Sequence, residues 1–452
     1  MRASHMADKP KPVQGVAPRL AAAQLLDLMF TRRLPLDEAL TRIVAKNRLN
    51  DDDRRLTHAI CASVFRNLPA IDAILRRVMK RESGPTPPRL HQLLRVGAAQ
   101  LIDLNVAPHA ALHATVSATG AMNLSSRKSL VNAVLRSVQR EHDARRIPAV
   151  AALDQLPQWL AGRWVKNYGK QVADKVATAM RQEAPVDLTI HDAQKSLQWA
   201  QELGGEVLLD GAVRVRHGPG QITAWPGFQT GAWWVQDIAS SLPVRMLGDV
   251  AGKVVLDVCA APGGKTMQLA AAGARVVALD VSASRIARLA DNLARTQLAA
   301  RVETVVADAR NWQMKDTAHA PMRGFDAVLL DAPCAATGTL RRHPELPWIH
   351  DENQVARMTL IQRELLWRAP DWLAPGGIML YVTCSMECDE GEDQVAAFLN
   401  HHKDFKLIHE IPDSVRPFLV SARDGLGFRT NPAYLAGGGG MDGFYIAPMK
   451  KS

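Results

Sequence analysis

The chain has 452 residues, of which 47% are hydrophobic and 22% charged, and its formal net charge is +10. A chain of this length is expected to form about two to four domains. No apolar run reaches the roughly 18 uncharged residues of a membrane span, and no basic segment followed by an apolar stretch opens the chain. A membrane-spanning protein and a secretory signal are therefore excluded, and we expect a soluble, cytoplasmic protein.

The positive charge is concentrated in the first third of the chain. Residues 1–150 contain 24 Lys and Arg against 12 Asp and Glu, a net charge of +12, whereas the remainder carries −2. Such an asymmetry favours a polyanion-binding module joined to a near-neutral body. The alternative is a solvated helical surface that happens to be cationic.

The first predicted elements are helices. Residues 1–15 are a polar leader, in which "MRASHM" is interpreted as a cloning remnant and Met6 as a natural start. Residues 16–146 are predicted to form an all-α domain, because their apolar residues recur at helical spacing. In "KSLVNAVLRSVQRE" one face collects Leu130, Val131, Val134, Leu135 and Val138.

A linker, "RRIPAVAALDQLP", introduces a segment of mixed character. Residues 147–245 combine helical stretches with the strand-like pieces "VDLTIHD", "AVRVRH" and "GAWWVQD". We expect a small α/β domain, interpreted as an RNA-recognition domain. Whether this domain is independent or packs on the C-terminal part of the chain is left open.

From residue 246 to 452 strands and helices alternate regularly. Apolar strands are predicted at "KVVLDVCA", "ARVVALD", "RVETVVAD", "FDAVLLD" and "GIMLYVTC". Continuous apolar strands separated by helices are typical of a parallel sheet covered on both faces. Ligands of such sheets bind beyond the carboxyl ends of the strands.

Chemically useful side chains follow the ends of these strands. The first strand runs into "CAAPGGKT", and the others end at Asp280, at Asp308, at Asp331 with Cys334 beyond it, and at Cys384. Acidic residues at strand ends often serve only as helix caps. Capping alone would not predict that reactive side chains gather at one edge of the sheet. We therefore expect one site at this edge.

The turn at Gly263-Gly264 allows a close approach of the backbone to a ligand, and the following helix offers free N–H groups. An acidic residue at the end of the second strand can accept hydrogen bonds from a ribose diol. A cofactor containing a nucleoside is therefore expected. "PGGK" matches neither G-x-G-x-x-G nor G-x-x-x-x-G-K-[ST], which argues against NAD and ATP.

The five cysteines are an odd number in a chain without a secretory signal, which favours reduced thiols. Cys384 and Cys388 have no companion pair at ligand spacing, so no metal is expected. Cys61 and Cys259 are interpreted as small buried residues. Cys388 lies in the acidic run "ECDEGED" and is given no role.

Three segments, "DVCAAPGGKT", "DAPCAATGTLRRHPELPW" and "YVTCS", resemble in this order the NOP/NOL/Sun family of RNA cytosine-5 methyltransferases. The layout of the chain is similar to that of the family's bacterial enzymes for 16S ribosomal RNA, whose first domain is NusB-like. The resemblance implies a Rossmann-like methyltransferase domain with a mostly parallel, seven-stranded sheet. It also implies S-adenosylmethionine as cofactor and 16S ribosomal RNA, or a partial small-subunit particle, as partner. One departure is Ala335, where the family usually has serine.

By the same resemblance, Asp280 would hold the ribose hydroxyls, Asp308 would face the adenine, and Asp331 would lie beside the target base. Cys384 would be the nucleophile and Cys334 would assist product release. The cofactor loop would consist of Cys259, Ala260, Ala261, Pro262, Gly263, Gly264 and Lys265.

The two thiols fit this chemistry. Carbon 5 of cytosine is a poor nucleophile, but a thiolate that adds to carbon 6 makes the ring an enamine that is electron-rich at carbon 5. Asp331 can protonate or hydrogen-bond ring nitrogen 3. A cysteine is mostly protonated near neutral pH, and positive potential from the cofactor sulfonium and from Lys265 can lower the pKa of the thiol. Cys334 can take the proton from carbon 5, directly or through water. DNA cytosine methyltransferases use the Pro-Cys thiol as nucleophile, so the assignment between Cys334 and Cys384 depends on the resemblance.

Between the fourth and fifth strands, Arg341, Arg342 and His343 are expected to contact RNA phosphates. Trp348 could stack on a base, but packing is favoured. The target base must leave its stack to reach the edge of the sheet.

Alternative functions are methylation of a transfer RNA cytosine and a non-catalytic, RNA-binding role in ribosome assembly. A nicotinamide-dependent oxidoreductase would share the sheet and the acid after the second strand, but it would leave both thiols unexplained. We expect a monomer.

Overall fold

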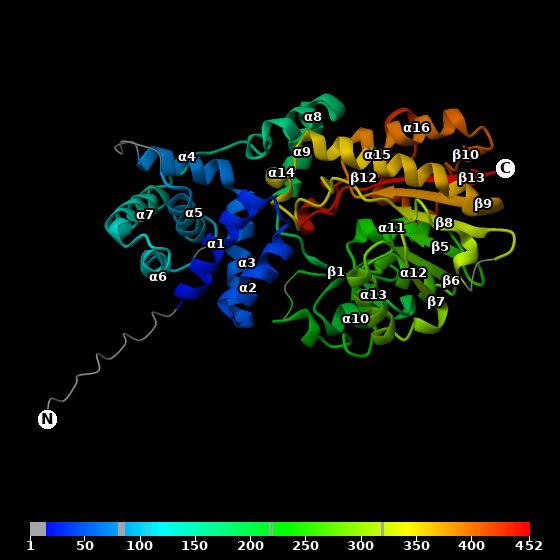
Figure 1. Cartoon of the computed structure of the whole chain (residues 1–452), viewed down its shortest axis with the longest axis horizontal. Coiled ribbons are helices and arrows are strands. Elements are labelled where there is room, and N and C mark those ends of the chain that lie inside the picture. Colours follow the sequence, from blue (N-terminus) through cyan, green and yellow to red (C-terminus); the bar gives the residue numbers. More distant parts are fainter. Residues whose placement is uncertain (1–14, 80–85, 105, 217, 219, 318–320) are drawn as a thin grey trace. The chain divides into compact units, whose positions relative to one another are not determined.

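The computed structural model describes residues 15–79, 86–104, 106–216, 218, 220–317 and 321–452 (Figure 1). Apart from Gly15, the predicted leader lies outside these residues. The chain forms two compact units, Met1–Gln158 with His343–His350, and Trp159–Arg342 with Asp351–Ser452. No helix in the described ranges combines the length and the apolar character that a membrane span needs. The predicted domain boundaries at residues 146 and 245 remain predictions.

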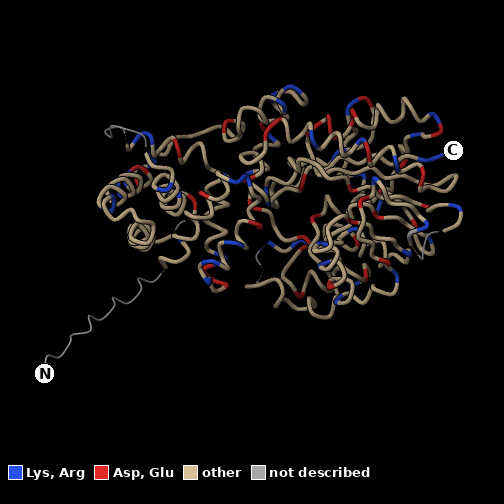
Figure 2. The backbone as a smooth tube through the Cα atoms, in the orientation of Figure 1, with Lys and Arg blue, Asp and Glu red and all other residues tan. Residues whose placement is uncertain are grey.

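The first unit is helical throughout its described residues, as predicted. Lys and Arg occur on most of its helices rather than on one (Figure 2). Its helices are α1 (Val16–Arg32), α2 (Leu36–Asn47), α3 (Asp51–Arg66), α4 (Leu68–Val78), α5 (Pro88–Ile102), α6 (Pro108–Ala121), α7 (Lys128–Asp143) and α14 (Leu346–Ile349).

Local sequence accounts for individual helices of this unit. The side chain of Asn50 caps α3 by accepting a hydrogen bond from the backbone N–H of Asp53, at 2.8 Å. Acidic residues in the first turn of α3 suit the positive end of the helix dipole. In α7 the predicted apolar face is buried at Val131, Val134, Leu135 and Val138. This face joins the core of the unit, which confirms the helical periodicity.

A short segment from between the fourth and fifth strands of the large sheet also belongs to the first unit. Trp348, in α14, packs against the helical core, so the packing interpretation is confirmed. The carboxyl of Glu345 is fully buried and accepts a hydrogen bond from the backbone N–H of Leu36 at 3.3 Å. Neither contact could be predicted from local sequence, because Leu36 and Glu345 lie 309 residues apart.

The second unit begins with α8 (Gln158–Tyr168) and α9 (Lys170–Met180) and continues into a small antiparallel sheet. Three of its strands were predicted, whereas β2 was not. The strand order is β2-β3-β1-β4, with β1 (Val186–Ile190), β2 (Glu206–Leu209), β3 (Ala212–Val215) and β4 (Trp233–Val235). Helix α10 (Ser196–Glu202) lies between β1 and β2 in the chain.

The large sheet has the order β11-β12-β13-β9-β8-β5-β6-β7 among the described residues, with β10 paired to β13. The five predicted strands are parallel to one another. They are β5 (Val254–Val258), β6 (Arg275–Asp280), β7 (Val302–Val306), β8 (Phe325–Asp331) and β9 (Leu373–Thr383).

The expected seven strands are corrected to nine in the described sheet. An antiparallel extension consists of β10 (Phe405–Leu407), β11 (Leu419–Ser421), β12 (Phe428–Thr430) and β13 (Tyr445–Lys451). Three of these strands have only three residues each, too few to show a period-two pattern.

Helices cover both faces of the parallel strands (Figure 1). One face packs with α11 (Ile238–Met246), α12 (Gly264–Ala271) and α13 (Ala283–Arg295), and the other with α15 (Glu352–Arg368) and α16 (Glu392–His401). Alternate strand residues, such as Val255 and Leu256, enter opposite cores. Ala212 and Trp234 from the small sheet enter the first of these cores, so the small sheet packs on the large one.

Candidate active site

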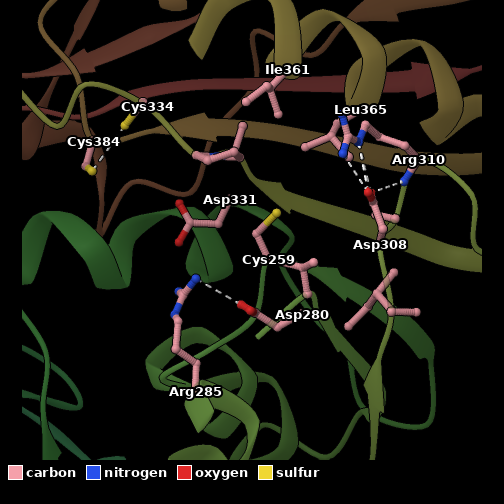
Figure 3. A pocket seen from close by; sticks show the side chains of 16 residues that line it. Cys259, Asp280, Arg285, Asp308, Arg310, Asp331, Cys334, Ile361, Leu365 and Cys384 are labelled. Atoms are coloured by element: carbon pink, nitrogen blue, oxygen red, sulfur yellow. Dashed lines mark hydrogen bonds and ion pairs between the residues drawn. The ribbon is translucent and has the colours of Figure 1, made fainter. Parts of the chain in front are cut away.

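A cavity of about 420 Å³ lies at the carboxyl ends of the parallel strands (Figure 3). It brings together predicted residues from five strand ends: Cys259, Asp280, Asp308, Asp331, Cys334 and Cys384. A parallel sheet places the carboxyl ends of its strands on one edge, which explains how residues up to 125 positions apart meet here.

The predicted cofactor loop separates this cavity from a second one. Gly263 has φ 106°, and a Cβ there would lie 2.1 Å from Cδ1 of Leu289, so only glycine fits. Of the loop, Cys259 lines the first cavity. A neighbouring cavity of about 350 Å³ is lined by Ala260, Ala261, Pro262, Gly264 and Lys265. Asp331 lines both cavities and therefore lies between them.

Asp280 is buried and connects the loop to the end of β6. Its Oδ1 accepts a hydrogen bond from the backbone N–H of Ser282 at 2.9 Å, and its Oδ2 accepts one from Ala261 at 3.2 Å. Oδ2 also lies 3.2 Å from Nη1 of Arg285. Arg285 lines the cavity, although sequence reasoning did not single it out. One indication of this role was present in the sequence: Arg285 lies on the helix that follows Asp280, the residue predicted to bind the ribose.

Asp308 follows β7 and pairs with another cation that sequence reasoning missed. Oδ2 of Asp308 lies 2.6 Å from Nη2 of Arg310. Hydrogen bonds from Arg310 lower the pKa of Asp308, so this carboxyl is ionised at neutral pH. The side chain of Asp308 remains 30% exposed, which leaves part of it open to a ligand.

The opposite wall of the cavity is apolar. Ile361 and Leu365 of α15 line it and lie four residues apart, on one face of the helix. This spacing was visible in the sequence, but nothing there indicated that the face borders a ligand. Carboxylates facing an apolar wall, in a cavity of this volume, fit a nucleoside with a ribose diol and a flat base.

The two predicted thiols are in contact. Sγ of Cys334, in the loop after β8, lies 3.4 Å from Sγ of Cys384, which follows β9 (Figure 3). Both are free cysteines. The hydrogen bond to Cys384, together with burial, raises the pKa of Cys334 well above that of an ordinary thiol. Either sulfur can donate the hydrogen bond between them.

Lys265 directs its charge at Asp331. Its Nζ lies 2.7 Å from Oδ2 of Asp331 and donates to the Ser240 hydroxyl at 3.2 Å. Nζ also lies 5.2 Å from the centre of the Phe444 ring. Because the side chain of Lys265 is 7% exposed, water screens this ion pair less than a surface pair.

The remaining cysteines are held as thiols. Burial raises the pKa of Cys259 to about 12, and it raises the pKa of Cys61 in the helical core. Burial and the Glu392 carboxylate raise the pKa of Cys388. The buried interpretation of Cys61 is confirmed, whereas Cys259 also lines the cavity.

The prediction that Arg341 contacts an RNA phosphate is corrected. Arg341 is fully buried, and its Nη2 donates to Asp237 at 2.6 Å and to Asp442 at 2.9 Å. Its Nη1 donates to the carbonyl of Gly439. The guanidinium is therefore a structural cation that joins three segments of the second unit.

The other two predicted RNA ligands remain accessible. Arg342 is 34% exposed, pairs with Asp442 and lines the second cavity. His343 is 42% exposed, with Nδ1 3.7 Å from Glu345, and belongs to the helical unit. Among the residues that the structure describes, no group of three or more His, Cys, Asp or Glu side chains could hold a metal ion.

Two family models match the chain. Residues 244–450 match the model described as 16S rRNA methyltransferase RsmB/F, and residues 16–140 match the NusB family. The two matches coincide with the large sheet and with the helical unit, respectively.

Similar proteins match over most of their length and carry the name ribosomal RNA small subunit methyltransferase B. The protein of Xylella fastidiosa is 36% identical over 454 residues, covering 97% of this chain and 98% of its own. That of Sodalis glossinidius is 34% identical over 417 residues (89% and 91%), and that of Erwinia tasmaniensis is 33% identical over 449 residues (96% and 98%).

Solved structures share the fold. One described as PH0851 has a TM-score of 0.75 at 23% identity, covering 99% of this chain and 100% of its own. NSun6 from Pyrococcus horikoshii with SFG has a TM-score of 0.55 at 20% identity, covering 65% and 98%. At these identities the likeness shows the fold alone.

Proposed function

The chain belongs to the RsmB/F family of S-adenosylmethionine-dependent 16S rRNA methyltransferases, and from that premise we propose that it methylates carbon 5 of a cytosine in small-subunit ribosomal RNA. The observation that carries the proposal is the pair of thiols, Cys334 and Cys384, whose sulfurs lie 3.4 Å apart at the wall of the cofactor cavity. Methylation of a nitrogen or a hydroxyl group requires no thiol, whereas carbon 5 must first be activated by a nucleophile.

The residues present fit the cofactor. Asp280 would hold the ribose hydroxyls, Asp308 would face the adenine, and Ile361 and Leu365 would offer the base an apolar wall; all four line the cavity. The backbone at Gly263 can come close to the ligand. When bound, S-adenosylmethionine supplies an electrophilic methyl group to the activated carbon 5.

Cys384 begins the reaction as the nucleophile. Its thiolate adds to carbon 6 of cytosine, and the electron pair of the double bond between carbons 5 and 6 is displaced away from carbon 6, which leaves carbon 5 electron-rich. While it carries a proton, Cys334 can hydrogen-bond the Cys384 thiolate across the 3.4 Å between the two sulfurs. The choice of Cys384 over Cys334 rests on the family resemblance of the "YVTCS" segment that contains Cys384.

Asp331 and Lys265 act on the charge that attack places in the ring. The Asp331 carboxylate, 30% exposed at the cavity, can accept a hydrogen bond from the exocyclic amine or, with a proton, donate one to nitrogen 3. Lys265, bonded to the same carboxylate, adds a fixed positive charge beside it. The pair therefore stabilises the ring while it carries negative charge.

Release requires that the carbon 5 proton leave and that the carbon–sulfur bond break. Once Cys384 is bonded to carbon 6, Cys334 gives its own proton to solvent, and its thiolate then accepts the carbon 5 proton, directly or through a water. The electron pair of the C5–H bond restores the ring double bond, and the pair of the C6–S bond stays on sulfur. Cys334 ends as a thiol and Cys384 leaves as a thiolate, so one proton in total has passed to solvent and the reaction balances.

Two variants test the mechanism. Cys384→Ala should abolish tritium transfer from labelled S-adenosylmethionine to 16S rRNA, whereas Cys334→Ala should accumulate a protein–RNA adduct that survives a denaturing gel. Cys388→Ala, outside the cavity, is the matched control and should do neither. If instead Cys384→Ala trapped the adduct, the two roles would be exchanged, and if neither variant trapped one, the covalent mechanism would be wrong.

The substrate is tested in cells. Bisulfite sequencing should show one unmethylated 16S cytosine in cells that lack the protein and its restoration by the wild-type chain. A changed transfer RNA cytosine in its place would move the proposal to that substrate. Restoration of ribosome assembly by Cys384→Ala, without methylation, would establish a non-catalytic role.

A further inference from the structure

A buried carboxyl and a buried amide hold the backbone on both sides of Cys334. Oε1 of Glu390 accepts a hydrogen bond from the backbone N–H of Ala335 at 2.8 Å. Nε2 of Gln362 donates to the carbonyl of Pro333 at 2.9 Å and to Oε1 of Glu390 at 3.0 Å. Together these bonds connect the residue before Cys334 to the residue after it. We call the pair Glu390 and Gln362 the loop clamp.

The loop clamp joins the two segments that carry the thiols. Gln362 comes from α15, whereas Glu390 ends a short 3-10 helix, Cys388–Glu390, six residues after Cys384. The hydroxyl of Tyr381, in β9, donates to the carbonyl of Glu390 at 2.8 Å. The clamp therefore positions the loop of Cys334 relative to the strand whose end bears Cys384.

Burying these two polar side chains lowers the stability of the fold, so a purely stabilising role does not explain them. Glu390 and Gln362 are both fully buried. Neither Oε2 of Glu390 nor Oε1 of Gln362 has a hydrogen-bond partner among the described residues. Burial raises the pKa of Glu390 to about 7, which shows how poorly the site solvates a charge. Buried acids of this kind are enriched at functional sites.

We propose that Glu390, with Gln362, is a positioning residue for Cys334, which fixes the thiol against Cys384 for the step that releases methylated RNA. The inference depends on the proposed covalent mechanism. The alanine at position 335 is compatible with it, because the clamp binds the backbone of that residue and not its side chain. Initial attack by Cys384 does not need a fixed Cys334 to the same degree, so the two half-reactions should respond differently.

Glu390→Ala should therefore slow release more than attack. A displacement of about 1 Å can cost on the order of 10²-fold in rate, and the fraction of enzyme held as a covalent RNA adduct should approach that of Cys334→Ala. Glu390→Gln keeps an oxygen for the N–H of Ala335 and for Gln362, so it should resolve the adduct nearly as fast as wild type. Asp389→Ala, at a half-exposed neighbour in the same short helix, is the matched control.

The pH dependence of release gives a readout that a purely structural role would not change. Glu390 interacts electrostatically with the thiol of Cys334, the phenol of Tyr381 and the carboxylate of Glu387, and it accepts a hydrogen bond from the amide of Gln362. Its negative charge helps to raise the pKa of Cys334. In Glu390→Gln that charge is absent, so the pH profile of adduct release should shift to lower pH.

Three outcomes separate the possibilities. If Cys334→Ala traps the adduct but Glu390→Ala does not, the loop clamp has no positioning role and the inference fails. If Cys334→Ala itself traps nothing, the covalent mechanism fails instead. Should Glu390→Ala not fold, as judged by binding of S-adenosylhomocysteine, Gln362→Ala removes the bond to Pro333 and must then trap the adduct if the inference holds.

Discussion

Replacement of Arg341 by methionine tests whether this residue holds the fold or binds RNA. Arg341→Met leaves Asp237 and Asp442 without their shared cation, and the side chains of these acids are only 3% and 0% exposed. Loss of one partner from a buried ion pair typically costs about 3–5 kcal/mol, because the remaining charge has neither water nor a counter-ion. Arg342 still pairs with Asp442, which favours the lower end of that range.

Urea unfolding followed by tryptophan fluorescence measures this cost in the relevant unit. Nine of the ten tryptophans lie in the second unit, so the signal reports mainly its unfolding. Arg342→Gln is the matched control: its side chain is 34% exposed and Asp442 keeps its hydrogen bond from Arg341, so this variant should cost less stability than Arg341→Met.

RNA binding at several salt concentrations completes the experiment. A lost phosphate contact lowers the dependence of affinity on salt, whereas a structural cation leaves that slope unchanged. If Arg341→Met unfolded no more easily than Arg342→Gln, and its salt slope fell, the assignment of Arg341 as a structural residue would be refuted.

Three further predictions concern Lys265, Asp280 and Asp257, the last of which is a fully buried residue of β5. Lys265→Met removes the cation 2.7 Å from Asp331 and should lower kcat about 10²-fold in tritium transfer, with partial recovery in Lys265→Arg; an unchanged kcat would contradict the role. Asp280→Asn removes a charged acceptor and should raise the Kd for S-adenosylhomocysteine about 10- to 100-fold in calorimetry, whereas equal affinity would exclude a ribose contact. Burial raises the pKa of Asp257 from 3.8 to about 7, so the folded state keeps a proton that the unfolded state loses, and stability falls as pH rises between these values. Asp257→Asn should reduce this loss of stability by up to about 1.4 kcal/mol per pH unit, and the part that Glu390 contributes should remain. The prediction fails if urea unfolding shows the same loss of stability between pH 4.5 and 7.5 in the mutant and the wild type.

The sequence predicts the catalytic edge well because the rule behind it is local. Each parallel strand is a continuous apolar run, and the residue after it must lie on the ligand side of the sheet. That reasoning alone places Asp331 and Cys384 at one cavity, and the structure agrees. The resemblance to the methyltransferase family and to NusB is confirmed by the family models.

Other features depend on contacts that no local pattern encodes. Arg341 looks like its neighbour Arg342 in sequence, and only the distant acids Asp237 and Asp442 make it a buried cation. Gln362 likewise lies on an amphipathic helix, where nothing marks it as a partner of the Cys334 loop. Pairings between residues so far apart become visible only when the chain is folded.

The placement of Trp348 in the helical core affects how the protein can be dissected. A fragment that stops at residue 158 would lack α14, so the core surface that receives Trp348 and the backbone N–H that meets Glu345 would be uncovered. A fragment that starts at residue 159 would contain α14, but it would lack the helical core against which Trp348 packs. Neither fragment therefore keeps all of its native contacts. A proteolytic cut in the connecting segment should yield two fragments that expose apolar surface and reassociate on mixing.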